Sequence, residues 1–122
     1  TVAGRARAGE VQEKSPLCFF GFIYAARGER SKIDPQILRL RPEEVIIPEL
    51  AYWLGSLYAV LGDSPQALTW LRRAIQLGNE NYPWFQRDQN LERLRNHPEF
   101  IRLLDQVRTQ WEKNRQLLAA AA

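Results

Sequence analysis

Apolar residues recur at three- and four-residue spacing along most of this chain, the periodicity of amphipathic helices. The clearest stretch runs from Pro48 to Gly78, and its first half carries one apolar stripe: Ala51, Leu54, Tyr58 and Leu61. Gly62-Asp63-Ser64 then interrupts the pattern with residues that favour turns. The pattern predicts a helix over Pro48–Leu61, a tight turn, and a second helix that starts at Ser64-Pro65 and stops at Gly78.

Three small residues of this hairpin, Gly55, Ala67 and Ala74, lie where the two helices have to come close. An upstream segment, predicted as a helix over Pro16–Arg27, repeats the same letters at one constant offset. The coincident pairs are Phe20 with Leu54, Gly21 with Gly55, Tyr24 with Tyr58, Ala25 with Ala59, and Gly28 with Gly62. We call this interval, from Gly28 to Gly62, the repeat offset. An internal repeat with this period is the strongest pattern in the sequence.

The returning half of the upstream repeat is irregular. Asp34-Pro35 predicts the start of a short helix, and its Ile37 and Leu40 occupy the places of Leu71 and Ala74. Pro42 interrupts that helix, since a proline in a helix interior costs about 3 kcal/mol. Pro42-Glu43-Glu44 predicts a new helical turn with both acids near its positive end. Ile33 replaces the small residue found at Ala67, so a close helix contact is not expected there.

The C-terminal part is predicted to close the array. A turn-rich connector contains Trp84 and Phe85 around a helix start at Pro83. The last helix is predicted from Pro98 to about Leu118, with an apolar stripe formed by Phe100, Leu103, Leu104, Val107 and Trp111. Its opposite face is polar, as expected of the helix that caps a repeat array.

The letters of the central hairpin carry a family resemblance. The pattern W-x2-L-G-x2-Y followed by A-x3-F is matched by Leu54, Gly55, Tyr58, Ala67 and Leu71. Ala51 stands in the Trp place and Asn79 in the Pro place. The chain thus resembles the tetratricopeptide repeat (TPR) family, whose helix-turn-helix period equals the repeat offset. The closing segment, from Asp88 to Leu104, resembles the C-terminal repeat regions of bacterial multidomain signalling proteins.

The resemblance implies an all-α, right-handed α-solenoid in a single domain over 1–122. Repeat one would span about 14–47, with its irregular second helix, and repeat two about 48–81. A C-terminal helical segment and cap would cover 82–118. Such arrays hold a peptide or a partner helix on their concave face.

Carried over by position, the partner-binding face of repeat two is Glu49, Tyr52, Trp53, Ser56 and Val60. The equivalents in repeat one are Ser15, Cys18, Phe19 and Phe22. These positions are not needed for packing within a repeat, so Phe19, Phe22, Tyr52 and Trp53 would form an exposed aromatic strip, and such patches mark contact surfaces. The alternative is that a preceding helix or the long final helix covers them.

Composition agrees with a soluble helical domain. The 122 residues are 45% hydrophobic and 25% charged, with a net charge of +3 from mixed basic and acidic residues. No clustered basic face is visible, so nucleic acid is not an expected partner. The single cysteine excludes an internal disulfide and favours a reducing, cytoplasmic location. No apolar run is long enough for a membrane span, and TVAGRARAGE is not a secretory signal.

The termini suggest a fragment of a longer protein, because the chain begins at Thr1 rather than Met. Residues 1–14 are interpreted as the end of a helix from a preceding repeat. The Ala119–Ala122 run is given no function.

Candidate chemistry is sparse. His97 is the only histidine and lies at a predicted helix start, so no metal site is expected. Cys18 has neither a second cysteine nor a neighbouring histidine, which favours a structural thiol over a nucleophile. Arg72 and Arg73 are interpreted as a solvated outer face. The chain is therefore not expected to be an enzyme or to need a cofactor.

The favoured hypothesis is a protein–protein interaction module that binds a peptide or partner helix. The alternative hypothesis is structural: self-association into a homo-oligomer, or intramolecular regulation of neighbouring domains in a larger signalling protein. The two hypotheses are motivated by the same apolar strip, so both stay open at this point.

Overall fold

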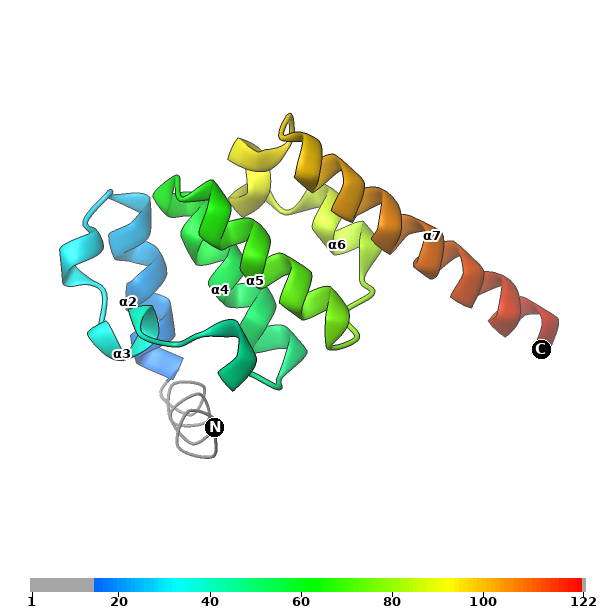
Figure 1. The fold of residues 1–122 in the computed structure, drawn as a ribbon, viewed down its shortest axis with the longest axis horizontal. Coiled ribbons are helices and arrows are strands. Elements are labelled where there is room, and N and C mark those ends of the chain that lie inside the picture. The colour runs from blue at the N-terminus through cyan, green and yellow to red at the C-terminus, as the bar shows by residue number, and fades with distance from the viewer. Residues whose placement is uncertain (1–14, 122) are drawn as a thin grey trace.

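The computed structural model describes the backbone of residues 15–121 and the side chains of residues 20–121. Across that range every regular element is helical and no strand occurs, which confirms the all-α fold class (Figure 1). The predicted helix end within residues 1–14 lies outside the described residues. The elements in chain order are α2 (Ser15–Ala26), η1 (Arg30–Lys32), α3 (Pro35–Leu38), η2 (Pro42–Glu44), α4 (Pro48–Leu61), α5 (Ser64–Gln76), α6 (Tyr82–Arg87), η3 (Gln89–Leu94) and α7 (Pro98–Ala121).

Helices α4 and α5 form the hairpin at the centre of the molecule, with the predicted turn between them (Figure 1). Gly62 ends α4 in the left-handed region at φ 82°, a conformation that glycine adopts without strain. The backbone N–H of Asp63 donates to the Tyr58 carbonyl at 2.9 Å. Its carboxylate then caps α5 by accepting from the Gln66 N–H at 3.3 Å. One turn therefore satisfies backbone groups of both helices.

The two helices come close at Gly55, as predicted. A Cβ added at Gly55 would lie 2.8 Å from the Leu71 side chain and 3.2 Å from the Leu71 nitrogen. Ala67 and Ala74 are fully buried on the facing side of α5. The small residues thus permit a close approach that larger side chains would block.

The repeat offset of the sequence recurs in the helix starts. Tyr82, the first residue of α6, follows Pro48 of α4 by the same interval, and so does Pro98 of α7 after Ser64 of α5. Gly28 repeats the Gly62 helix ending, with φ 71°. Two helix starts and one helix ending therefore recur at the period of the sequence repeat.

The helices lie in two layers. Helix α4 packs against α2 on one side and η3 on the other, whereas α7 packs against α5 and α6. Because α4 also contacts α5, it lies at the centre of the core. The first layer therefore contains α2, α4 and the α6–η3 pair, and the second contains α5 and α7.

The segment between α2 and α4 is irregular, as predicted from its prolines. The Asp34 carboxylate caps α3 by accepting from the Gln36 N–H at 2.8 Å. Ile33, Ile37 and Leu40 are all buried. Pro42–Glu44 forms a single 3-10 turn, so the segment reaches α4 without a full returning helix.

Arg73 does not belong to a solvated outer face. Its guanidinium is half-buried and donates twice to the Val45 carbonyl, from Nε at 3.2 Å and Nη2 at 3.1 Å. Arg72 forms an ion pair with Glu99 of α7. The predicted outer-face role was therefore wrong for Arg73, whereas Arg72 keeps 43% of its side chain exposed beside Glu99.

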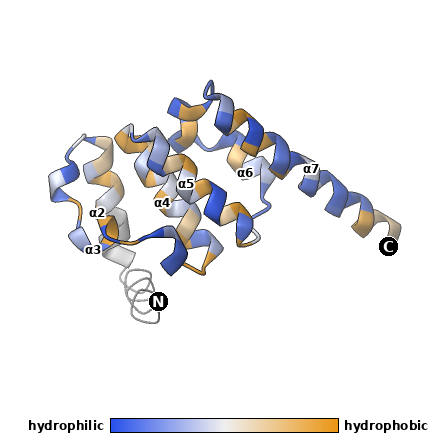
Figure 2. Ribbon diagram, in the orientation of Figure 1, coloured by the Kyte–Doolittle hydropathy of each residue, from blue (hydrophilic) through white to orange (hydrophobic). Residues whose placement is uncertain are grey.

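Helix α7 extends beyond the predicted end near Leu118 and continues to Ala121. Phe100, Leu103 and Val107 of the predicted stripe are buried, whereas Leu104 and Trp111 are half-buried. The second half of α7 projects away from the other helices (Figure 1). Its surface is mostly hydrophilic, with hydrophobic residues near the end (Figure 2).

Candidate functional site

The partner-binding residues predicted on α4 differ in their exposure. Glu49 is exposed at the first turn of the helix, and Trp53 and Val60 are half-buried. Tyr52 and Ser56 have only 8% and 2% of their surface exposed. The face defined by these five residues is therefore open at Glu49 and closed at Tyr52 and Ser56.

The segment that covers Tyr52 is α6 with η3. The Tyr52 ring packs edge-on against Phe85, with ring centroids 4.9 Å apart. Its hydroxyl donates to the Asp88 Oδ2 at 2.5 Å. Burial and the hydrogen bond to Asp88 raise the pKa of Tyr52. The covering element is thus neither a preceding helix nor the long final helix.

Asp88 holds this cover in place at the break between α6 and η3. Its Oδ1 accepts from the Asn90 N–H at 2.9 Å and caps η3. Its backbone carbonyl accepts from the Arg95 Nη2 at 2.7 Å, and the Phe85 carbonyl accepts from the Arg95 Nη1 at 2.9 Å. The break is therefore fixed by side-chain hydrogen bonds on both of its flanks.

The predicted aromatic strip is not continuous. Phe22 of α2 meets Trp53 edge-on, with centroids 5.2 Å apart, and both rings are half-buried. The Tyr52 ring packs against Phe85 and does not extend the Phe22–Trp53 pair. Phe19 belongs to α2, but its side chain, like those of Ser15 and Cys18, lies outside the described residues.

An open hollow of about 400 Å³ lies where the start of α4 faces the loop after α5. Two of the predicted residues, Glu49 and Tyr52, line it. Trp84 of α6 also lines it and has 57% of its surface exposed. The remaining lining residues are Pro48, Gly78, Asn79, Glu80 and Asn81. We call this hollow, defined by these eight residues, the Trp84 groove.

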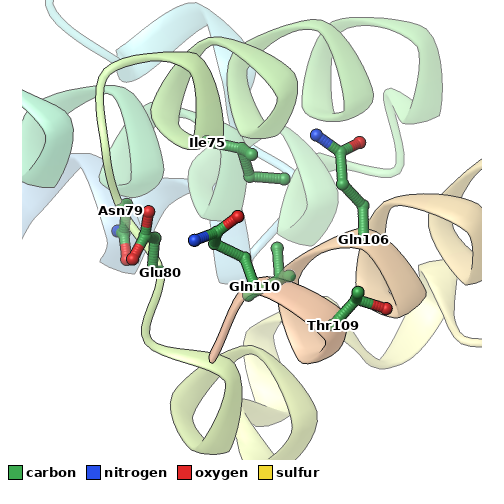
Figure 3. A pocket seen from close by; sticks show the side chains of 7 residues that line it. Ile75, Asn79, Glu80, Gln106, Thr109 and Gln110 are labelled. Carbon is green, nitrogen blue, oxygen red and sulfur yellow. The ribbon is translucent and has the colours of Figure 1, made fainter. Parts of the chain in front are cut away.

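Two further hollows adjoin the Trp84 groove. One, of about 500 Å³, shares Asn81 and Trp84 with it and reaches Arg87 and Gln89. The other, of about 370 Å³, lies between α5 and α7 and shares Asn79 and Glu80 with it. Figure 3 shows the Gln110 side chain extending toward Glu80 and Asn79, with Gln106 at the other end of this third hollow. Glu80 accepts a hydrogen bond from the Asn114 amide.

The groups around the Trp84 groove are suited to binding. They comprise two carboxylates, two primary amides and an indole, all on the surface.

Within the described residues, no group of three or more His, Cys, Asp or Glu side chains is placed to hold a metal ion. His97 is exposed, and its Nδ1 accepts from the Glu99 N–H at 3.2 Å at the start of α7. None of the helices in the described range is both long and apolar enough to cross a membrane.

No known protein family, no curated protein and no solved structure matches the chain.

Trp84 is the residue that sequence reasoning missed, because the local pattern assigns it to a turn-rich connector. The usable signal was the repeat offset, which sets Tyr82 at the position of Pro48 and Trp84 at that of Leu50. Leu50 is buried, whereas Trp84 is exposed. Trp84 lies near the start of a helix that begins one repeat offset after α4, and this position makes it a candidate for contact with a partner.

Proposed function

We propose that this chain is a protein–protein interaction module of the TPR type, which binds an extended peptide in the Trp84 groove. Its helices would form a right-handed solenoid, with α7 as the terminal cap. The support is the recurrence of helix starts at the repeat offset together with the two-layer contacts of α4, α5 and α7.

The observation that carries the proposal is the exposure of Trp84 between two open hollows. Trp84 has 57% of its surface exposed, so a large apolar ring is in contact with water, which is unfavourable. Tryptophan residues are enriched at binding surfaces. The hollows on either side share Trp84 and Asn81, so one extended segment can lie across both. The side-chain amides of Asn79 and Asn81 provide N–H donors for a peptide backbone. Their oxygens already accept from the Asn81 and Trp84 N–H groups, and each retains one further lone pair.

The family resemblance extends the proposal to the whole protein. The module would belong to a larger cytoplasmic signalling or regulatory protein of bacterial type, without catalytic activity of its own. The groove would then receive a segment of another protein or of another domain of the same protein.

Selection of random 12-residue peptides on the complete 122-residue chain tests the proposal. Enriched peptides should bind with the indole N–H of Trp84 as the most strongly shifted resonance in a ¹H–¹⁵N spectrum. Trp84→Ala should weaken that binding at least tenfold, or about 1.4 kcal/mol.

Leu117→Ala is the matched control, since Leu117 is similarly exposed at 61% but lies near the end of α7. Equal loss of binding in both variants, or peptides that leave the Trp84 resonance unchanged, would contradict a binding role for the groove.

A second candidate function is self-association through the projecting half of α7. Leu104, Trp111 and Leu118 repeat at heptad spacing along this helix. Leu117 and Leu118 are 61% and 73% exposed. Sedimentation velocity would detect a dimer that Leu118→Glu converts to monomer, whereas a monomer at high concentration would dismiss this candidate.

A further inference from the structure

We propose that the Trp84 groove binds a basic segment and receives an arginine side chain of the partner between the indole and two carboxylates. The proposal rests on the proposed function and adds the chemistry of the partner. It depends on three features of the groove: its charge, the state of the Trp84 ring, and its shape.

The charge of the groove is opposite to that of the chain. The chain carries a net +3, yet the charged residues that line the groove are Glu49 and Glu80. Over the described range, no ion pair joins either carboxylate to a cationic side chain. The lining of the groove itself is therefore negative, while Arg87 lines the adjoining hollow, and a cationic side chain complements the groove.

Among the described side chains, three aromatic rings have an arginine near the ring and Trp84 does not. Arg30 lies 5.5 Å from the Tyr58 centroid, Arg95 lies 5.6 Å from Phe100, and Arg115 lies 4.8 Å from Trp111. Among the side chains of residues 20–121, no arginine or lysine occupies the equivalent place over Trp84. Its exposed face is thus available for a guanidinium from another molecule.

The shape of the groove favours arginine over a compact cation. The hollow of about 400 Å³ accommodates a long side chain, whose methylene stem can lie along the indole. A guanidinium presents five N–H donors in a plane, which matches carboxylate oxygens and amide carbonyls. Glu49 provides such acceptors, and so do the Glu80 carboxylate, which also accepts from Asn114, and the second lone pairs of the Asn79 and Asn81 amide oxygens.

The test is a charge-reversal selection on the complete chain. Random 12-residue peptides are selected in parallel on the unmodified chain, on Glu49→Lys and on Glu112→Lys. Glu112 is the matched control because it is exposed on α7 and does not line the groove, and the substitution changes the net charge equally. A selected arginine peptide and its citrulline analogue, which is neutral but of the same shape, are then titrated.

The proposal expects arginine-rich peptides from the unmodified chain and from Glu112→Lys. Glu49→Lys should lower affinity for those peptides at least tenfold and select acidic peptides instead, which Glu112→Lys, of the same net charge, should not do. Citrulline should also weaken binding at least tenfold, and Trp84→Ala should abolish saturable binding of the arginine peptide.

Two contrary outcomes distinguish a failure of the arginine inference from a failure of the proposed peptide binding. Apolar or acidic peptides that bind at Trp84 of the unmodified chain would overturn the arginine inference and leave peptide binding standing. A chain that enriches no peptide at Trp84 would overturn both.

Discussion

Helix α4 and the α6–η3 pair begin one repeat offset apart and pack side by side, but only α4 is continuous. Helix α4 runs unbroken from Pro48 to Leu61. The corresponding stretch breaks at Asp88, which ends α6 and caps η3. The position of Asp88 in this register corresponds to Leu54, a fully buried residue of α4.

The difference shows how a repeat can retain its spacing while its surface changes. A leucine at the middle position contributes only to packing, whereas the Asp88 carboxylate accepts from the Tyr52 hydroxyl and the Asn90 N–H. Those bonds draw η3 against α4 and close the face at Tyr52. The short helix α6 before the break leaves Trp84 exposed beside the start of α4.

The largest loss of stability is expected at Asp88, where the break between α6 and η3 lies. Asp88→Ala removes the acceptor of the buried Tyr52 hydroxyl and the cap of η3, so we expect the free energy of unfolding to fall by about 3 kcal/mol. Urea denaturation measures this change. Asp88→Asn is the control, because it keeps an acceptor oxygen and should lose less than Asp88→Ala; equal losses would contradict the hydrogen-bond account.

The next effect tests the close approach of α4 and α5. Gly55→Ala places a Cβ 2.8 Å from the Leu71 side chain and close to the Leu71 backbone, which cannot retreat easily. We expect a loss of about 2 kcal/mol in the free energy of unfolding, because overpacking outweighs the gain in helix propensity. A variant as stable as the parent in thermal and urea unfolding would show that the helices are not this close.

A smaller, pH-dependent effect is expected at Tyr52. Tyr52→Phe removes one hydrogen bond to a carboxylate and should cost about 1.5 kcal/mol at neutral pH. The pKa of Tyr52 is higher in the folded chain than in the unfolded chain. Its contribution to stability is therefore fully present below the unfolded pKa of about 10 and is lost as the pH rises above it.

The parent chain should consequently lose stability faster than Tyr52→Phe above pH 10, and the gap between them should narrow. Tyr58, whose pKa is also raised by burial, titrates in both proteins and cancels in the difference. Parallel pH profiles from urea unfolding at pH 7 to 11 would contradict the raised pKa of Tyr52.

The smallest expected change is a gain, not a loss, in the free energy of unfolding. Gly21 occupies in α2 the place that Gly55 occupies in α4, but an added Cβ there would meet Trp53 at 3.6 Å, an ordinary contact. Gly21→Ala should therefore stabilise the chain by up to about 1 kcal/mol through helix propensity. A loss as large as that of Gly55→Ala would mean that α2 and α4 pack as closely as α4 and α5.

Local signals in the sequence accounted for the regular elements. Pro48 and Gly62 bound α4 as predicted, Ser64 begins α5, and Pro98 begins α7. These boundaries depend on proline at the first turn and on glycine at positive φ, which act within a few residues.

The candidate site depended on contacts between distant segments. Tyr52 and Asp88 are 36 residues apart, and nothing in the local pattern indicates that a carboxylate in a turn accepts from a tyrosine in α4. The same contact covers Tyr52, and Trp84 lines one hollow together with Glu49. The family resemblance predicted a contact face on α4 by position, and the structure shows that Glu49 on that face is exposed whereas Tyr52 and Ser56 are buried.

The central claim is that the open part of the α4 face, between Glu49 and Trp84, is where a peptide binds. The most direct measurement is a ¹H–¹⁵N titration of the chain with a selected arginine peptide, in which the four tryptophan indole resonances are followed separately. The account predicts the largest saturable shift at Trp84, with backbone shifts at Glu49 and Glu80 and little change at the buried Trp70. Saturable shifts confined to α7, with Trp84 unmoved, would contradict it.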